Sequence, residues 1–371
     1  MPTASTPTRW KLVLGSNADT NNQLPLDVDY QGMDQVLTAL YDEQAERKAG
    51  LGGSAPRVSR WLGDIRTYFP SEVVAVMQRD AMQRLGLQRL LMEPEILRTV
   101  HADVHLVGTL MSLSRVMPQK VKHTAREVVL KVVKELEQKL ADPLRQAVQG
   151  ALSRAVRNTR PRYREIDWAA TIRVNLKHYQ PAQRTIIPEK LVGFGRRGQA
   201  LKEIVLCVDQ SGSMASSVVY AGVFGAVLAS IKAVKTHMVV FDTSVVNLSD
   251  NLRDPVDLLF GVQLGGGTDI NLALAYCQQL ITRPTDTVLV LISDLYEGGN
   301  QQEMLKRAAA LRAAGVTLVA LLALSDDGAP SFDRHVAEQL AAFDIPSFAC
   351  TPAKFPELMA AAIQGRALAA G

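Results

Sequence analysis

The sequence predicts an α/β fold class: a doubly wound, mostly parallel sheet in the carboxyl-terminal part of the chain, preceded by an all-α amino-terminal domain. Short runs rich in Val, Ile and Leu alternate with helical segments in the second half, whereas the first part shows helical periodicity. Charge also divides the 371 residues, because residues 145–202 carry a net +10 and residues 203–371 carry −7. We therefore expect a helical domain over 1–144, a basic connecting segment over 145–200 and an α/β domain over 201–371.

The amino-terminal helices are predicted from apolar spacing and from residues that favour helix ends. One helical face is formed by positions i, i+3, i+4, i+7 and i+8, namely Met33, Val36, Leu37, Leu40 and Tyr41. Ser71 is expected to cap a second helix, which Gly86 ends. A third helix has a broad apolar face over 128–140. Asp142 and Pro143 are expected to start a fourth helix.

The connecting segment is rich in arginine, with aromatic residues between the charges. Residues 145–202 contain 13 basic and 3 acidic side chains, interleaved with Tyr163, Trp168 and Tyr179. Three interpretations remain open: a structural linker that docks on the acidic domain, a surface for a protein partner, or a nucleic-acid patch. No RNA-binding or zinc-finger pattern supports the last of these.

The α/β domain is predicted from four apolar runs and the helical segments around them. The strand runs are 203–209, 237–242, 286–294 and 315–325. The helical segments are 218–234, 270–281, 301–315 and 355–364. The strand runs are apolar at consecutive positions, which is typical of strands covered on both faces. This alternation predicts a doubly wound sheet.

Three aspartates, Asp209, Asp242 and Asp294, lie where predicted strands end. In a doubly wound sheet, these strand ends line the ligand crevice at the topological switch point. Carboxylates that share a partly desolvated crevice repel one another. A cation is therefore expected at this edge of the sheet.

Hydroxyl groups accompany the carboxylates in the same loops. Ser211 and Ser213 alternate with Asp209 in one tight loop, and Thr268 follows three glycines in another. Together with Asp294 they form an all-oxygen set, which suits a hard ion such as Mg²⁺, with Mn²⁺ as the alternative. Histidine and cysteine are absent from these loops, which argues against zinc.

The motifs DQSGSM, GGGTD and ISD, in this order, resemble the metal-ion-dependent adhesion site (MIDAS) of a von Willebrand factor A (VWA) domain. The resemblance implies that Asp209, Ser211, Ser213, Thr268 and Asp294 bind the metal, and that the ion binds an acidic side chain of a partner. The whole architecture resembles bacterial CoxE-like proteins, which commonly work beside MoxR-family AAA+ ATPases in protein maturation or remodelling. It implies a non-enzymatic, cytoplasmic adaptor whose partner is such an ATPase or an acidic protein client.

Several details near the site stay open at this point. Leu295 follows Asp294 where many VWA relatives have glycine, so the geometry of this third loop is undecided. Asp269 is expected either to cap the next helix or to support the ligands, and the role of Asp242 is open. Two helix amino termini at this edge are expected to favour an anion.

Two other functions compete with a binding module. A Mg²⁺-dependent hydrolase could use Asp209 or Ser211, but Ser211 stands where a haloacid-dehalogenase-like site would have a second aspartate, and no histidine is near to act as base. No phosphate-binding loop motif occurs either. The second alternative is a nucleic-acid-binding scaffold that uses the arginine-rich segment.

The remaining features of the sequence favour an ordinary intracellular protein. No run of about 18 apolar residues predicts a membrane span, and no secretory signal is seen. The cysteines Cys207, Cys277 and Cys350 are expected to be buried free thiols. His101 and His105 are four residues apart, which a zinc site on a helix can use, but structural roles are expected because no third ligand is evident.

Overall fold

The structure, a computed structural model, divides the chain into two compact units, Met1–Val132 and Val133–Gly371. The division falls within the long helix α8 (Gln119–Ala155). The structure describes residues 10–12, 26–41, 55–84, 91–114, 116–155, 157–158, 163, 166–181, 183–194, 202–262, 266–326 and 330–366.

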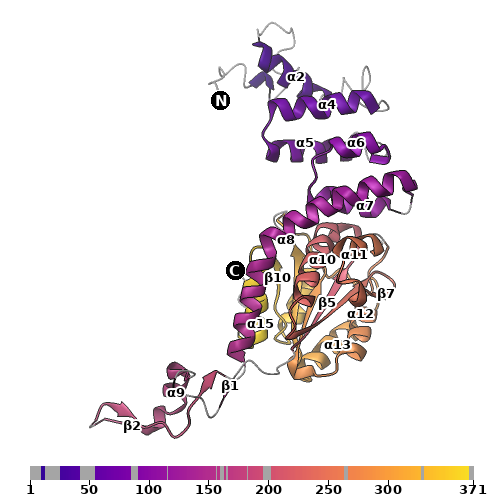
Figure 1. Cartoon of the computed structure of the whole chain (residues 1–371). Coiled ribbons are helices and arrows are strands. Elements are labelled where there is room, and N and C mark those ends of the chain that lie inside the picture. Colours follow the sequence, from indigo (N-terminus) through magenta and orange to yellow (C-terminus); the bar gives the residue numbers. More distant parts are fainter. Residues whose placement is uncertain are drawn as a thin grey trace. The chain divides into compact units, whose positions relative to one another are not determined.

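Helices make up the described part of the first unit, in agreement with its predicted periodicity (Figure 1). Before α8 they are α2 (Val28–Tyr41), α4 (Ala55–Tyr68), α5 (Ser71–Arg84), α6 (Pro94–Thr99) and α7 (Val104–Leu113). On the predicted face of α2, Val36 and Leu40 are buried, and the Trp61 indole of α4 donates to the Val36 carbonyl at 3.1 Å. Tyr41 lies at the edge, where its hydroxyl donates to Asp80 at 2.6 Å. Apolar packing and a few such bonds therefore hold α2, α4 and α5 together.

The predicted helix ends are only partly recovered. Helix α5 begins at Ser71, as expected, but the Ser71 side chain and Gly86 lie outside the described residues. The prediction that Pro143 starts a new helix is wrong, because α8 continues through it. A proline inside a helix removes one backbone hydrogen bond. Here Leu144 and Val148 are both fully buried beyond the proline, and their packing keeps the helix continuous.

The second unit is built on a six-stranded sheet in the order β10-β9-β8-β5-β6-β7. Its strands are β5 (Lys202–Asp209), β6 (Val234–Phe241), β7 (Val245–Asn247), β8 (Thr287–Ile292), β9 (Thr317–Leu324) and β10 (Ser347–Cys350). All neighbours are parallel except β6 and β7. The chain adds β6 and β7 on one side of β5 and then returns to place β8 on the other. The topological switch point therefore lies between β5 and β8.

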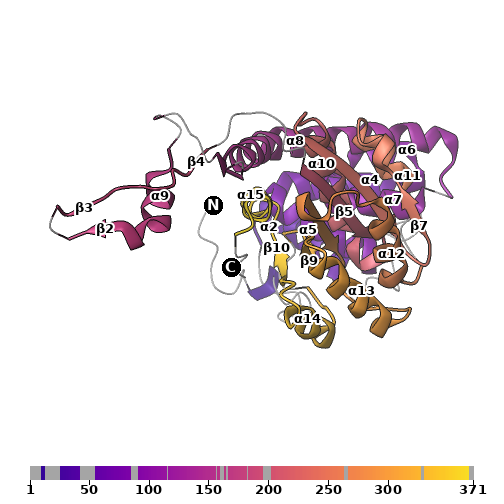
Figure 2. The ribbon, with the colours of Figure 1, turned by 90° about the horizontal axis from the view of Figure 1, so that it is seen from below.

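Helices flank this sheet on both faces (Figure 2). On one face, α12 (Ile270–Leu280), α13 (Gln301–Ala313) and α14 (Arg334–Ala341) form one apolar cluster with the strands. On the other, α10 (Ala215–Ala229) packs on β5 and meets α15 (Phe355–Gln364), where the rings of Phe224 and Phe355 stack 4.3 Å apart. Helix α11 (Pro255–Gly261) contacts α10. The predicted α/β class, a mostly parallel sheet between helices, is thus observed.

One described stretch, Gly212–Ala229, is long and apolar enough to cross a membrane by length and composition, but 67% of it is buried within the unit. The three cysteines also lie in the interior, free and buried as predicted. Burial raises the pKa of the Cys350 thiol to about 11. A thiol held protonated in this way is a poor nucleophile.

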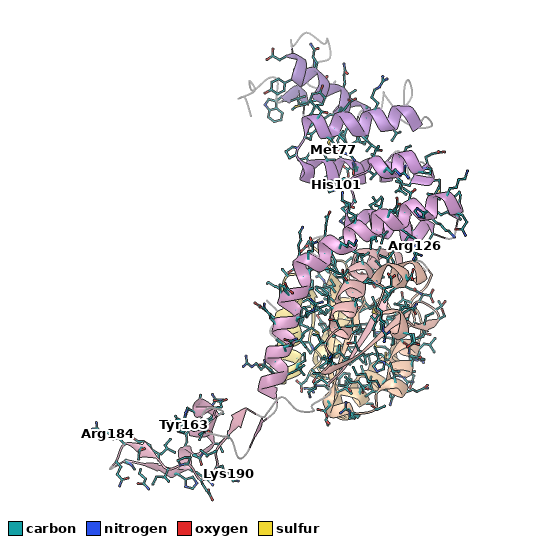
Figure 3. The ribbon with its side chains drawn as sticks, in the orientation of Figure 1. Met77, His101, Arg126, Tyr163, Arg184 and Lys190 are labelled. Atoms are coloured by element: carbon teal, nitrogen blue, oxygen red, sulfur yellow. The ribbon has the colours of Figure 1, made fainter. Side chains whose placement is uncertain are left out.

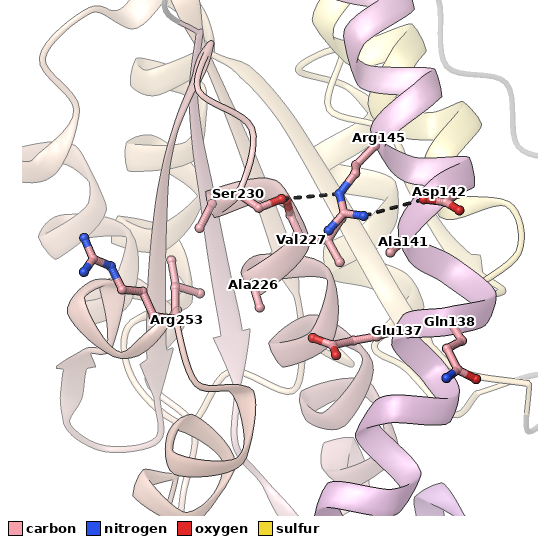
Figure 4. A pocket seen from close by; sticks show the side chains of 11 residues that line it. Glu137, Gln138, Ala141, Asp142, Arg145, Ala226, Val227, Ser230 and Arg253 are labelled. Carbon is pink, nitrogen blue, oxygen red and sulfur yellow. Dashed lines mark hydrogen bonds and ion pairs between the residues drawn. The ribbon is translucent and has the colours of Figure 1, made fainter.

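The carboxyl-terminal half of α8 lies against α10 within the second unit (Figure 4). Arg145 connects them, because its Nε donates to the Ser230 hydroxyl at 3.4 Å while its Nη1 lies 3.5 Å from Asp142. A pocket of about 630 Å³ lies between these helices, lined also by Glu137 and Arg253. None of the predicted metal ligands lines it.

The basic connecting segment folds into a small module, here named the arm, between Arg157 and Phe194. It consists of strand β1 (Arg157–Asn158), helix α9 (Trp168–Val174), the hairpin of β2 (Tyr179–Gln180) and β3 (Thr185–Ile186), and strand β4 (Gly193–Phe194). Strand β1 pairs antiparallel with β4, and β2 with β3. The described residues of the arm thus have hydrogen bonds of their own.

Candidate metal centre

The first loop of the site is hydrogen-bonded to the last residue of the strand that precedes it. Strand β5 ends at Asp209, and a 3-10 turn, Gly212–Met214, leads into α10. The Asp209 side chain is fully buried; one carboxylate oxygen accepts the Ser211 backbone N–H at 2.8 Å, and the other accepts the Ser293 hydroxyl at 2.8 Å. Asp209 therefore fixes both the turn after β5 and the residue before Asp294.

Hydrogen bonds join four of the five predicted ligands across the switch point. The Ser211 and Ser213 hydroxyl oxygens are 3.2 Å apart, and Ser213 donates to the Asp294 carboxylate at 2.8 Å. With Asp209 bonded to the Ser211 backbone, side chains from the ends of β5 and β8 meet at one place. Thr268 is half-buried in the next loop, and among the described residues its hydroxyl makes no hydrogen bond to these four.

The two carboxylates of this group lack a positive partner in the described chain. Asp209 is 0% and Asp294 8% exposed, and no described Lys, Arg or His forms an ion pair with either. Burial raises the pKa of Asp209, and the nearby Asp294 charge raises it further, against the bonds from Ser211 and Ser293. Like charges held together in this way favour a bound cation.

The donor set decides which cation the site suits. In the described parts of the chain, no three His, Cys, Asp or Glu side chains are grouped as a metal site. A cation held by the two carboxylates would therefore have to complete its ligands with hydroxyls or water. All-oxygen ligation of this kind fits Mg²⁺ or Mn²⁺ and does not fit a thiolate or imidazole zinc site.

The third loop accommodates Leu295 in a backbone conformation that normally favours glycine. Leu295 has φ +65°, and its N–H donates to the Ser293 hydroxyl at 3.1 Å. Its side chain is fully buried in the same cluster as α12 and α13. Burial of the leucine thus offsets the cost of the left-handed conformation, which is about 1 kcal/mol or more for a residue with a Cβ.

We expect Leu295→Gly to destabilise the protein in spite of relieving this strain. The gain is about 1 kcal/mol, whereas the loss of a buried leucine side chain costs about 2–5 kcal/mol. Urea unfolding should show a net loss of about 1–4 kcal/mol, and Leu295→Ala, which keeps the strain, should lose more. A glycine variant as stable as the wild type would mean that the leucine packing does not hold this loop.

Glu297 connects the third loop to the Thr268 loop and is absent from the ligand set predicted by sequence. Its carboxylate accepts the Ile270 backbone N–H at 2.7 Å and the Gly299 N–H at 3.2 Å. In parallel, Gly298 donates to the Thr268 carbonyl at 2.8 Å. A Cβ on Gly298 would lie 2.8 Å from that carbonyl oxygen, so only glycine permits this approach. The signal in the sequence that could have indicated this role is that Glu297 directly precedes two glycines.

Asp269 and Asp242 have structural roles in these loops. Asp269 is the N-cap of α12, because its side chain accepts the Leu272 N–H at 2.8 Å. Asp242 accepts both the N–H and the hydroxyl of Ser244, at 2.7 and 2.8 Å, and its carbonyl accepts the Asp269 N–H at 2.8 Å. Together with Glu297, Asp269 occupies amide groups of the α12 amino terminus. These amide groups are therefore engaged by the chain's own carboxylates, and the anion preference expected of the two helix termini stays a prediction.

The histidine pair in the first unit is not arranged on one helix. Helix α7 begins at Val104 with Asp103 as N-cap, so His101 precedes the helix that contains His105. His101 is labelled in Figure 3, and its backbone N–H donates to the Gln78 side chain at 3.0 Å. The spacing of four therefore does not place both imidazoles on a common helical face.

The six-stranded sheet with helices on both faces, and the hydrogen-bonded carboxylates and hydroxyls at its switch point, define a VWA-type domain. The model of the family described as "VWA domain containing CoxE-like protein" matches residues 140–359, and the chain belongs to this family. Over 364 residues it is 34% identical to the uncharacterized protein YehP of Escherichia coli (strain K12), with 96% of each chain covered.

Solved structures show more distant likenesses. An aerotolerance-related membrane protein from Bacteroides fragilis NCTC 9343 is 14% identical, with a TM-score of 0.34, and the match covers 44% of this chain and 99% of that one. The RO (RSR) protein of Deinococcus radiodurans is 16% identical, with a TM-score of 0.33, over 97% of this chain and 73% of that one. Likenesses at this level carry no functional argument.

Proposed function

We propose that this protein is a non-enzymatic, metal-dependent protein-binding module. Asp209, Ser211, Ser213, Thr268 and Asp294 hold a Mg²⁺ or Mn²⁺ ion, and the site binds an acidic side chain of a partner. The resemblance to CoxE-like proteins implies that the partner is a MoxR-family AAA+ ATPase, or a client that such an ATPase remodels. The chain then acts as their adaptor.

The hydrogen-bonded group formed by Asp209, Ser211, Ser213 and Asp294 is the observation that carries this proposal. Two buried carboxylates and two hydroxyls meet where no described basic side chain neutralises them. A divalent ion supplies that positive charge and the electrostatic attraction for a partner carboxylate. The serine hydroxyls and the two aspartates would hold the ion, while the partner adds a further oxygen.

The chain's own residues prepare the site before any partner arrives. Ser293 holds one Asp209 oxygen at 2.8 Å, and the Ser211 N–H holds the other at 2.8 Å. Both oxygens are therefore oriented, which lowers the cost of ordering the site on binding. Glu297 and Gly298 keep the Thr268 loop next to the third loop. The Thr268 hydroxyl is thereby kept close to Asp294's loop.

Glu297→Ala should weaken metal binding through the position of Thr268. The variant leaves the Ile270 N–H without its partner, so unfolding free energy should fall by about 1 kcal/mol, and Mg²⁺ affinity by about 10-fold. Glu297→Gln keeps one accepting oxygen, which can serve Ile270 or Gly299 but not both, and should lose less stability and affinity than the alanine variant. Isothermal titration with Mg²⁺ and urea unfolding measure the two effects. A loss of stability without a loss of affinity would leave Glu297 as a helix cap alone.

The experiment that tests the proposed function measures metal and partner together. Wild type and Asp209→Ala are titrated with Mg²⁺, and a purified MoxR-family ATPase from the same source is then offered to each in Mg²⁺ and in EDTA, with binding followed by interferometry. We expect the ATPase to bind only wild type, and only with metal.

The matched control is Asp250→Ala, which removes an exposed carboxylate outside the site. It should bind Mg²⁺ and the ATPase as wild type does. Equal ATPase binding in EDTA, or by Asp209→Ala, contradicts the metal-dependent scheme. Mg²⁺ binding without any ATPase binding retains the site but assigns it to an acidic client instead.

A further inference from the structure

The arm has an interior made of polar groups rather than apolar side chains. Thr171 and Asn175 are each 1% exposed and are one helical turn apart on α9. The Thr171 hydroxyl bonds both the carbonyl and the N–H of Val192 at 3.0 Å. The Asn175 amide donates to the Lys190 carbonyl at 2.8 Å, and its oxygen accepts the Glu189 N–H at 2.9 Å. This network fixes which face of α9 turns inward.

Beside this inward face, the arm exposes apolar side chains to solvent. Trp168, Ile172 and Leu176 follow at i, i+4 and i+8, and they are 48%, 47% and 58% exposed. Tyr163 is 79% exposed and makes an edge contact with the Trp168 ring, with centroids 5.9 Å apart. Val174 of α9 and Tyr179 and Ile187 of the hairpin region are exposed as well, at 47%, 49% and 58%. Seven such side chains among the described residues of so small a module are unlike singly scattered exposed residues.

The arm also exposes basic side chains, and the acidic ones among its described residues are engaged. Arg173, Lys177, Arg184 and Lys190 are all exposed, and Figure 3 labels Arg184 and Lys190 on the arm. Asp167 caps α9 by accepting the Ala170 N–H at 3.0 Å. Glu189 lies 2.9 Å from the His178 ring nitrogen. The surface therefore combines apolar and aromatic groups with positive charge.

We propose that the arm binds to the surface of a membrane, and that its ligand is an anionic lipid bilayer. Trp and Tyr place an apolar ring and a polar edge at the headgroup level, and Lys and Arg bring long apolar stems with a charge that attracts anionic lipid. The positive charge complements that surface. The same charge opposes stacking of the arm against the arm of a second copy. The inference is independent of the metal centre.

The test uses the purified full chain, in EDTA, with sedimented vesicles of phosphatidylethanolamine and phosphatidylglycerol at 3:1, and of phosphatidylcholine alone. We expect binding to the anionic vesicles only, weakened by 0.5 M NaCl. The Arg173→Gln variant should lower partitioning about 5-fold, and Ile172→Ser with Leu176→Ser by at least about 10-fold. Leu272→Ser, at a leucine on α12 that is 42% exposed, is the control outside the arm and should bind as wild type does.

Circular dichroism and urea unfolding establish that the variants are folded. In a Trp10→Phe background, Trp168 emission should shift to the blue on anionic vesicles, because Trp61 is already buried. Equal binding to both kinds of vesicle, or unchanged binding by the Ile172 and Leu176 variant, overturns the proposal. So does arm-dependent binding to a 20-nucleotide single-stranded RNA without vesicle binding, or arm-dependent dimerisation in light scattering.

Discussion

Asp294→Asn should abolish metal binding while leaving the metal-free protein as stable as wild type, or more stable. The substituted side chain has one oxygen and one amide nitrogen, which can replace the two carboxylate oxygens. The amide can donate to the Ser213 hydroxyl. That hydroxyl then donates to Ser211 across their 3.2 Å separation. The substitution also removes the charge that faces buried Asp209. A functional site that holds like charges close together is destabilised by their repulsion, so the folded protein gains stability when one of these charges is removed.

Thermal unfolding with and without Mg²⁺ measures this separation. Wild type should gain stability with Mg²⁺, because a ligand that binds only the native state stabilises it. Asp294→Asn should not respond, and its Mg²⁺ affinity should fall at least about 100-fold. Its unfolding free energy without metal should be unchanged or higher by about 1 kcal/mol. A Mg²⁺-dependent rise in the variant would remove Asp294 from the ligand set.

Lowering the pH should remove a contribution to stability from the amino-terminal end of β5. This contribution is larger than the change expected for Asp294→Asn. Glu203 is fully buried and accepts the Lys235 ammonium at 3.0 Å, the Thr282 N–H at 3.2 Å and the Thr287 hydroxyl at 3.3 Å. Burial alone raises the Glu203 pKa, but the bonds from Lys235 and Thr282 outweigh it and lower the pKa from 4.5 to about 2. The ionised form is therefore the stable one in the folded protein.

The sign of the pH dependence follows from this depressed pKa. Stability from Glu203 is fully present above about pH 4.5 and is lost as the pH falls toward about 2. Since Lys235 is half-exposed, solvent screening limits the contribution to about 1–3 kcal/mol. Urea unfolding of wild type and Glu203→Gln should differ by that amount at pH 6, and the difference should close near pH 2. A constant difference would assign the loss to packing instead.

His237 adds to acid sensitivity without contributing at neutral pH. It is 8% exposed, its Nε2 lies 3.6 Å from Glu203, and burial lowers its pKa below 6.5 despite that carboxylate. The unfolded chain therefore binds a proton before the folded one does, and stability falls as the pH drops below about 6.5. Because Glu203 raises the His237 pKa, Glu203→Gln also changes this term, so the two proteins are compared in a His237→Gln background that lacks it.

Sequence predicted the interior of the sheet better than its edges. The runs that became β5, β6, β8 and β9 are apolar at consecutive positions because helices cover both faces, and that pattern is visible without coordinates. Strand β7 has three partly or fully exposed residues, and β10 four residues of which one is buried, so neither shows the pattern. Pro143 misled the helix boundary because tertiary packing outweighed a local signal.

For the site, the sequence predicted the side chains at the strand ends but not what holds them. The carboxyl ends of the strands line one edge of a doubly wound sheet, so Asp209 and Asp294 could be expected at the same edge, although the adjacency of β5 and β8 depends on the strand order. Ser293 and Glu297 act through bonds between loops whose mutual approach depends on three-dimensional folding. The metal itself remains a prediction from the chemistry of the donor set.

The continuity of α8 determines where the polypeptide can be truncated so that the second unit keeps its packing. The family match starts at residue 140, within the helix, and Leu144 and Val148 are fully buried in the second unit. A fragment that starts at residue 201, before β5, would lack that helix and leave α10 without the partner that bonds Ser230. A fragment from about residue 133 retains both. The helix that divides the polypeptide into two units is therefore itself an integral part of the second one.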